Sequence, residues 1–382
     1  MSPAMEMGAE SWENEDEDQI SEAKYQQGVK HLCDNIGIKR LPRKYILPIS
    51  ERPIFKNAEK NANCTNLPII DFAQLQGSNR SQVLKNLSKA CEENGLFQLV
   101  NHGIPRDVLN SMRDVTRRFF ELPYEERSQY MSADMGNLVR YGTSFNQNKD
   151  GVFTWRDFLK LTCNPLSDAI PHFPTFPLDF RTVVATYAKE TKFLSIMLME
   201  AILESLGLGC DDINNTKMEE DDILKEFQDG SHLMILNCYP SCPQPDLTLG
   251  MPPHSDYGFI TLLLQDNVPG LQIEHDGNWI TVEPIPNSFV VNLGDHLEIF
   301  SNGKYKSVLH RVMVNSLRSR ITVASLHSLP WATTVRPWSR LINEANPKRY
   351  MDTDFTTFLA YITSCEPKKK NFLESRKLIT RQ

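Results

Sequence analysis

The sequence predicts an α+β protein in which a helical N-terminal region is wrapped on an antiparallel β core. In residues 180–209 the apolar side chains recur at helical spacing over several turns, which indicates a helix packed against a core. After Gly230 the pattern changes to short apolar or alternating runs separated by Pro, Gly, Asn and Asp. Closely spaced strands of this kind are typical of a β-sandwich or barrel. No internal repeat stands out.

The elements before the β core can be placed one by one. The expected order is a strand at 67–72, a helix at 81–95, a strand at 95–104, a helix at 105–123 and the long helix at 180–209. Leu84, Leu87 and Cys91 share one face of the first helix, which makes it amphipathic. Pro105 suits the first turn of the second helix, because its φ is already helical and its missing N–H is not needed there.

Seven strand-like runs form the expected core, and a helical pattern returns after them. The runs are 232–240, 258–265, 270–275, 279–285, 288–294, 307–314 and 320–329, followed by the helical pattern at 354–362. The chain is therefore divided into an acidic tail and linker (1–65), a mainly helical region (66–225), the β core (226–332) and a helical segment with a basic tail (333–382).

Composition excludes several classes of function. The net charge of -7 gives no electrostatic reason to bind nucleic acid or an anionic membrane surface. The acidic N-terminus does not resemble a signal peptide, and the most apolar long segment carries Glu200 and Glu204 and is too short to span a bilayer. The 8 cysteines contain no C-x-x-C pair and are expected to be reduced thiols. We expect a cytoplasmic monomer that acts on a small molecule.

A pair of metal-ligand side chains precedes the apolar run at 258–265. His254 and Asp256 are two residues apart, so at a strand end both side chains point to the same side. A third ligand has to come from elsewhere, and spacing alone does not choose among the histidines nearby, which are His232, His275, His296, His310 and His327. Two histidines and one carboxylate on one face of a β core are typical of non-haem Fe(II) oxygenases.

From residue 67 to about Leu329 the chain resembles the plant iron- and 2-oxoglutarate-dependent dioxygenases of specialised metabolism, the flavanone 3-hydroxylase, downy-mildew-resistance and anthocyanidin synthase types. The matching blocks, in the family's order, are GLFQLVNHGIP, WRDFLKL, NCYPSCPQPDLTLG, PPHSDYGFITLLLQDNVPGLQI, NSFVVNLGDHLEIFSNGKYKSVLHRV and RSRITVASLH. The resemblance implies a double-stranded β-helix, or jelly-roll, core and His310 as the third ligand. It also implies that His102 is a structural residue, and it argues against His296, which stands where the family often has glutamine.

The resemblance also implies a site for 2-oxoglutarate. A planar guanidinium suits the far carboxylate of this oxo acid, and Arg320 lies on the same strand face as Thr322. The family carries arginine and serine at these positions, so the hydroxyl is retained here. Arg318 is a competitor on the same face, but the motif favours Arg320. Asn237 and Tyr239 match the family's N-x-Y motif, which contacts the oxo acid.

Substrate contacts are expected from a loop after the second helix and from the strands that carry the co-substrate residues. The candidates are Tyr141, Phe145, Ile235, Leu326 and Ser328. The last three replace a lysine, a phenylalanine and a glutamate of the anthocyanidin synthase type, which favours a flatter or more apolar substrate, such as a simple phenolic, coumarin, terpenoid or alkaloid.

The reaction that the resemblance implies uses Fe(II), 2-oxoglutarate and O2, with ascorbate as reductant, and releases succinate and CO2. Hydroxylation of a small, largely apolar or aromatic metabolite is the expected outcome. Desaturation and O-demethylation are alternatives within the family, as is an oxidase that uses ascorbate in place of 2-oxoglutarate. A jelly-roll receptor without activity is the alternative from another class, and it would be expected to lose a metal ligand or the arginine. Both are present here.

Overall fold

The computed structural model describes residues 27–36, 38–53, 67–144, 150–208, 223–364 and 371–378. The predicted acidic tail and Phe145 lie outside these residues. Two sheets with helices around them form the architecture, which confirms the α+β prediction with a jelly-roll core. None of the helices within the described residues is long and apolar enough to cross a membrane.

The major sheet has eight strands in the order β1-β2-β10-β7-β12-β5-β4-β3. Their bounds are β1 (Ile69–Asp71), β2 (Leu96–Val100), β3 (Val139–Thr143), β4 (Asp157–Thr162), β5 (His232–Tyr239), β7 (Ile260–Gln265), β10 (Phe289–Leu293) and β12 (Arg320–His327). β1 pairs with β2 in parallel, and the other neighbours are antiparallel. The region before residue 226 thus contributes four strands to the same sheet as the β core.

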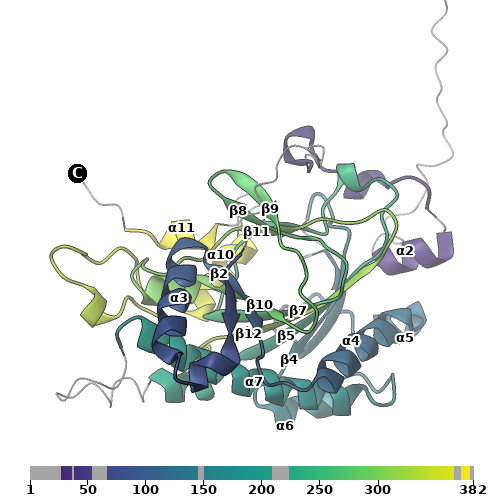
Figure 1. Ribbon diagram of the computed structural model, residues 1–382. Coiled ribbons are helices and arrows are strands. Elements are labelled where there is room, and N and C mark those ends of the chain that lie inside the picture. The colour runs from purple at the N-terminus through teal and green to yellow at the C-terminus, as the bar shows by residue number, and fades with distance from the viewer. Residues whose placement is uncertain are drawn as a thin grey trace, which may run out of the picture.

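The minor sheet has four strands in the order β6-β11-β8-β9. They are β6 (Met251–His254), β8 (Leu271–His275), β9 (Asn278–Thr281) and β11 (His310–Val312). In Figure 1, β8, β9 and β11 lie above the major sheet and α7 lies below it. Leu271 and Ile273 of the minor sheet share a buried cluster with Leu263 and Val290 of the major sheet, so the two sheets pack face to face.

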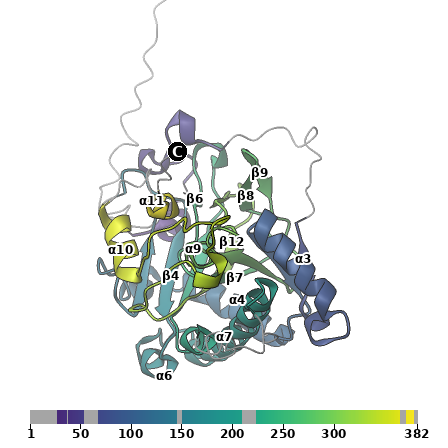
Figure 2. The ribbon, with the colours of Figure 1, turned by 90° about the vertical axis from the view of Figure 1, so that its left-hand side faces the viewer.

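Helices cover the other face of the major sheet and its ends. They are α2 (Val29–Ile36), α3 (Arg80–Glu93), α4 (Arg106–Glu121), α5 (Tyr124–Ser128), α6 (Leu166–Ala169), α7 (Phe180–Ser205), a turn of helix at 223–228, α9 (Asp295–Phe300), α10 (Phe355–Ser364) and α11 (Phe372–Arg376). In Figure 2, α10 lies on one side of the sheets and α3 on the other.

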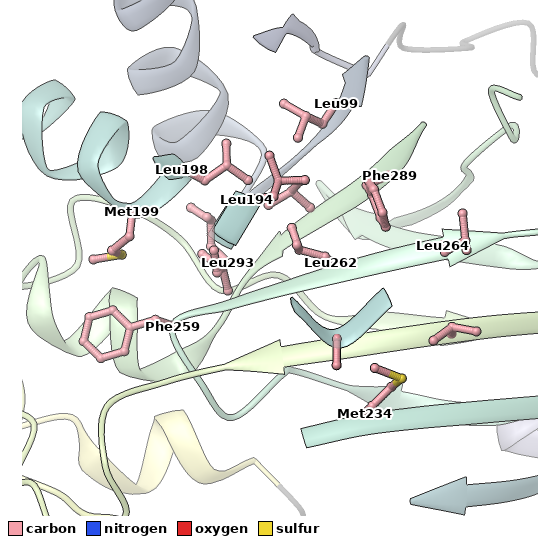
Figure 3. Close-up of a cluster of buried hydrophobic side chains, with 14 of the residues drawn as sticks. Leu99, Leu194, Leu198, Met199, Met234, Phe259, Leu262, Leu264, Phe289 and Leu293 are labelled. Carbon is pink, nitrogen blue, oxygen red and sulfur yellow. The ribbon is translucent and has the colours of Figure 1, made fainter. Parts of the chain in front are cut away.

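The long predicted helix is α7, and its apolar face is buried as its spacing predicts. Leu194 and Leu198 pack with Leu262 of β7 and Leu293 of β10, as Figure 3 shows. Because side chains alternate along a strand, this helix-facing side is opposite to the side that faces the minor sheet. Residues of β7 and β10 that alternate with Leu262 and Leu293 therefore face the minor sheet.

Several elements differ from those predicted. β6 was missed because its sequence contains Pro252 and Pro253, which disfavour strands except at a sheet edge, and β6 is an edge strand. α9 lies between two predicted strands, in a segment for which no helix was predicted. β3 and β4 were not assigned as strands from the sequence, although they extend the major sheet beyond β5.

Two histidines face each other in the helix layer. His232 of β5 and His327 of β12 are direct partners across the strands, and their rings stack at 4.2 Å between centroids. Both are buried, and among the residues that the structure describes Nε2 of His232 and both ring nitrogens of His327 have no hydrogen-bond partner. Burial, with the nearby Lys192 ammonium, lowers the pKa of His232 to about 3 and holds the pKa of His327 well below its usual value.

These histidines should make the fold sensitive to acid. Below pH about 6.5 the unfolded chain takes up protons at both imidazoles that the folded chain does not accept, so the free energy of unfolding falls as pH falls toward 3. The slope is at most about 1.4 kcal/mol per pH unit for each imidazole. Urea unfolding of the metal-free protein between pH 7 and pH 5 measures it, and His232→Leu should have a shallower slope. Equal slopes in both proteins would rule the effect out.

Candidate active site

Strand pairing brings three predicted metal ligands together. His254 ends β6 and His310 begins β11, and the two are direct antiparallel partners with ring centroids 4.1 Å apart. Asp256 follows in the turn after β6, and its Oδ1 lies 3.9 Å from Nε2 of His254 and 3.6 Å from Nε2 of His310. One ligand atom from each of the three residues lies within 4.8 Å of the others.

The hydrogen bonds of the two histidines set their tautomers. Nδ1 of His254 lies 2.9 Å from the carbonyl oxygen of Pro252, and Nδ1 of His310 lies 3.3 Å from that of Val308. A carbonyl only accepts, so each Nδ1 carries the proton and each Nε2 keeps a free lone pair. Burial and then the His310 ring lower the pKa of His254 to about 3, so its imidazole is neutral at physiological pH, as a metal ligand has to be.

The aspartate is held as a carboxylate between these imidazoles. Burial by itself would raise its pKa, but a proton on His310 or His254 and hydrogen bonds from Thr261 and Asn292 outweigh burial and lower the pKa of Asp256. Asn292 donates to Oδ2 at 3.3 Å, which leaves Oδ1 toward the imidazoles. Two neutral nitrogens and one carboxylate oxygen on one side fit a divalent iron of the facial-triad type.

The other histidines lie outside this cluster. His232 and His327 are in the helix layer, and His275 lies beside Asp276 near the surface. His296 is buried in α9 with Nδ1 3.1 Å from Oγ of Ser328. His102, in the VNHGIP block, lies at a turn. Its Nε2 is 3.0 Å from the carbonyl oxygen of Asn287, and its Nδ1 accepts from the amide of Ile104.

Four predicted co-substrate residues are neighbours on β5 and β12. Arg320 is the direct partner of Tyr239, and Thr322 is the direct partner of Asn237. The guanidinium of Arg320 lies over the Tyr239 ring at 5.3 Å from its centroid, and Nδ2 of Asn237 donates to Oγ1 of Thr322 at 3.3 Å. The structure therefore places all four on the face that looks toward the minor sheet.

Arg320 is a buried cation with neutral partners. It is 2 % exposed, and it donates to the carbonyl of Val268 at 3.1 Å and to Oε1 of Gln265 at 2.6 Å. Burial lowers the pKa of this guanidinium, while Tyr239 and the Asp266 carboxylate act in the opposite direction. Arg318, the alternative candidate for binding the far carboxylate, is exposed in the turn before β12. A buried guanidinium that donates to two neutral groups, on Val268 and Gln265, is suited to bind an anion.

Comparisons with known proteins agree with this geometry. A family model described as the 2OG-Fe(II) oxygenase superfamily matches residues 230–328, and one described as the non-haem dioxygenase in morphine synthesis N-terminal matches residues 67–177. The chain is 42% identical over 319 residues to Protein DMR6-LIKE OXYGENASE 2 of Arabidopsis thaliana, covering 84% of this chain and 88% of that protein. The chain belongs to the 2OG-Fe(II) oxygenase superfamily.

Further relatives support the same conclusion. The dioxygenase is 39% identical to Flavanone 3-dioxygenase 2 of Oryza sativa subsp. japonica, over 83% of this chain and 89% of that protein. Its fold is similar to the crystal structure of JOX2 in complex with 2OG, Fe and JA, with a TM-score of 0.79, 33% identity, and coverage of 92% of this chain and 97% of that one. The protein is thus a dioxygenase that depends on Fe(II) and 2-oxoglutarate.

A partly exposed stripe marks the face of the dioxygenase's major sheet next to the metal cluster. We define it by its half-exposed members on adjacent strands, which are Lys160, Leu233, Ile235, Ala324 and Leu326. Leu326 is aligned with Thr261, and Thr261 with Asn292, which are the two residues that hydrogen-bond Asp256. These strands are antiparallel, and one face of an antiparallel sheet often reaches solvent, so the stripe is an accessible part of this face.

The five candidate substrate residues end up in different places. Ile235 and Leu326 belong to the stripe, and Ser328 is buried beside His296. Tyr141 is not brought to the site: it lies in the helix-side core, where its hydroxyl accepts from Arg127 at 2.8 Å and donates to Asp157 at 3.0 Å. Phe145 lies outside the described residues.

Sequence reasoning missed two basic residues near the site. Arg156 is buried and donates to Oδ1 of Asn237 at 3.4 Å and to the carbonyl of Ser144 at 3.0 Å. Lys160 lies in the stripe as the direct partner of Ile235. The alternation in WRDFLKL was a usable signal, because residues 156, 158 and 160 recur at the spacing of one strand face.

Proposed function

We propose that this dioxygenase hydroxylates a small organic acid with an apolar or aromatic body, at an Fe(II) ion held by His254, Asp256 and His310. The observation that carries the proposal is the convergence of these three side chains, with ligand atoms within 4.8 Å of one another. With Fe(II) bound, such a site supplies oxidation of a C–H bond by O2, coupled to conversion of 2-oxoglutarate to succinate and CO2.

The protein's own residues bind and orient the reactants. Arg320 pairs with the far carboxylate of 2-oxoglutarate, and the hydroxyl of Thr322 adds a hydrogen bond from the same strand face. Tyr239 and Asn237 form the side of this site that β5 contributes. No side chain has to act as nucleophile, so the position of the substrate carbon decides the product. Hydroxylation is the primary proposal, and desaturation or demethylation would appear as different mass changes in the same assay.

Lys160 is the reason for proposing that the substrate carries an acid group, because its ammonium can pair with a carboxylate. The ammonium donates to the carbonyl of Met135 at 2.7 Å. Burial, and then the nearby Arg140, lower its pKa to about 8, while the Asp134 carboxylate acts to raise it, so the ammonium stays largely charged at neutral pH. A half-buried cation beside Ile235, with Ala324 on the next strand, favours a ligand that is anionic on one side and apolar on the other.

A metabolite screen tests the function as a whole. Purified protein with Fe(II), 2-oxoglutarate and ascorbate is incubated with plant extract and with a panel of organic acids, and products and succinate are followed by mass spectrometry. A product heavier by one oxygen that depends on 2-oxoglutarate supports the proposal. Absence of metal binding and of succinate formation would instead favour a non-catalytic jelly-roll receptor, and turnover without 2-oxoglutarate would favour the oxidase alternative.

Replacing Lys160 should change the preference for an acidic group. Wild type should bind phenylacetate more tightly than phenylacetamide, and Lys160→Met should lose most of this preference, by about 2 kcal/mol or roughly 30-fold. Ligand-observed NMR of the anaerobic protein loaded with Co(II) and 2-oxoglutarate measures both affinities. Lys160→Arg keeps the charge and serves as the control. Equal binding of acid and amide to wild type would remove the acid from the proposal while leaving the iron site intact.

We propose that the active enzyme is a monomer in the cytosol and that ascorbate serves as its reductant. Free thiols support a reducing compartment: of the described residues, Cys33, Cys91, Cys163, Cys238 and Cys242 form no disulfide. Light scattering after size exclusion and localisation of a fluorescent fusion check the two points separately.

A further inference from the structure

The first residue of α9 contacts both chain segments that carry the proposed metal ligands. Ser255, the residue between the first two ligands, donates its hydroxyl to Oδ2 of Asp295 at 3.1 Å. Ser307 lies just before the segment of the third ligand and donates its hydroxyl to Oδ1 of the same carboxyl group at 2.8 Å. One carboxyl group, only 1% exposed, therefore connects the two segments.

Backbone contacts hold this carboxyl group in place. The amide of Asp295 donates to the carbonyl of Asp256 at 2.8 Å, and the amide of Gly294 donates to the carbonyl of Phe259 at 2.9 Å. A Cβ at Gly294 would lie 2.1 Å from the carbonyl oxygen of Gly258, so only glycine permits this close approach. The start of α9 is thus packed directly against the turn that contains Asp256.

A second acidic residue of α9 fixes the other segment. Oε2 of Glu298 accepts from the backbone amide of Ser307 at 2.5 Å, and its Oε1 accepts from the hydroxyl of Tyr350 at 2.6 Å. The chain leading to β11 is therefore bound to α9 through both the backbone and the side chain of Ser307. α9 acts as a common support for both segments.

The strand ladder between the two segments does not provide the same constraint. β6 and β11 pair at His254–His310 and at Met251–Val312, with a shift of register between these two pairs. The bulge bends β6 and increases its local twist, because the extra residue leaves part of the pairing unmade. The contacts of α9 lie outside this ladder and add a second connection between the segments that carry Nε2 of His310 and Oδ1 of Asp256, which are 3.6 Å apart.

We propose that Asp295 is a positioning residue that sets the spacing of the two ligand-bearing segments and thereby the affinity of the site for its metal. The inference rests on the ligand set of the proposed function. Asp295 acts through its neighbours, because both of its oxygens already accept from serine hydroxyls. Loss of an outer partner of this kind weakens metal binding by about 10- to 100-fold in metal sites generally.

Cobalt binding tests the inference without any turnover. Metal-free protein with 2-oxoglutarate is titrated with Co(II) under anaerobic conditions, and visible absorption gives the dissociation constant. Asp295→Ala should weaken binding by about 10- to 100-fold. Asp295→Asn should stay within about threefold of wild type, because its amide can accept from one serine and donate to the other.

A second buried carboxylate provides the control for a purely structural effect. Asp157 is fully buried on the helix side of β4 and accepts from the amides of Val29 and Lys30 and from the hydroxyl of Tyr141. Asp157→Asn should lower the unfolding temperature of the metal-free protein and leave the Co(II) dissociation constant unchanged. If Asp295→Ala does not fold, Ser307→Ala removes one half of the connection and takes its place, with weakening of at least about fivefold expected.

The possible outcomes separate this inference from the function it rests on. Co(II) affinity within about threefold of wild type in the Asp295→Ala or Ser307→Ala protein, or the same loss in Asp157→Asn, would overturn the positioning role. Failure of the wild-type protein to bind Co(II) would overturn the ligand set itself. Weakening in Asp295→Ala and Ser307→Ala with rescue by Asp295→Asn supports the inference.

Discussion

Replacing Asp256 by alanine should abolish turnover and nearly all metal binding. The substitution removes the carboxylate that faces both imidazoles and leaves two neutral nitrogens, which do not neutralise a divalent cation. The loss of affinity should exceed the roughly 100-fold that loss of an outer partner costs. Co(II) titration gives the affinity, and succinate release with Fe(II) and 2-oxoglutarate gives the activity.

His102 offers the matched control for this variant. His102 is also a buried polar residue at a turn, but its ring forms hydrogen bonds with the backbone of Asn287 and Ile104 and not with the metal-ligand cluster. His102→Gln should cost stability and leave the Co(II) dissociation constant within the error of the titration. Activity retained in Asp256→Ala, or metal binding lost equally in both variants, would contradict the proposed ligand set.

Replacing Arg320 by glutamine should selectively impair use of 2-oxoglutarate. The variant removes the charge of a buried guanidinium but keeps a hydrogen-bonding side chain against Gln265. Truncating one partner of a buried charged pair costs about 2 to 4 kcal/mol, which corresponds to a rise of roughly 30- to 1,000-fold in the KM for 2-oxoglutarate. Co(II) affinity in the absence of the oxo acid should stay near that of wild type, because Arg320 contacts no metal ligand in the described structure.

Two residues earlier the chain provides a control with the same chemistry. Arg318 is exposed, so Arg318→Gln should leave the KM for 2-oxoglutarate unchanged. The oxo acid 2-oxopentanoate lacks the far carboxylate, so wild type should use it much less well than 2-oxoglutarate. In Arg320→Gln the difference between the two oxo acids should be much smaller. The reverse pattern, with Arg318→Gln impaired and Arg320→Gln normal, would move the anchor to the other arginine.

Much of the candidate site could be predicted because its residues come in pairs at the period of a strand. His254 with Asp256, Arg320 with Thr322, and Asn237 with Tyr239 each lie two residues apart, and the structure places each pair close together on one side. The failures have two causes: the alternation around Arg156 and Lys160 was present but not used, and Tyr141 was not recognised as part of a strand. Tyr141 was assigned to a loop, and once β3 forms, its position on that strand turns the side chain into the helix-side core.

The sequence by itself determined the class of fold, the helical face of α7 and the chemical character of the three proposed ligands and the arginine. Local periodicity suffices for the fold class and for the face of α7, whereas His310 and Arg320 were chosen by the resemblance of their sequence blocks to those of the dioxygenase family. Only the tertiary structure decided that His310 pairs with His254, that Lys160 joins Ile235 in one stripe, and that Asp295 connects Ser255 to Ser307. Those contacts depend on strand order and register across long chain separations, which no local pattern encodes.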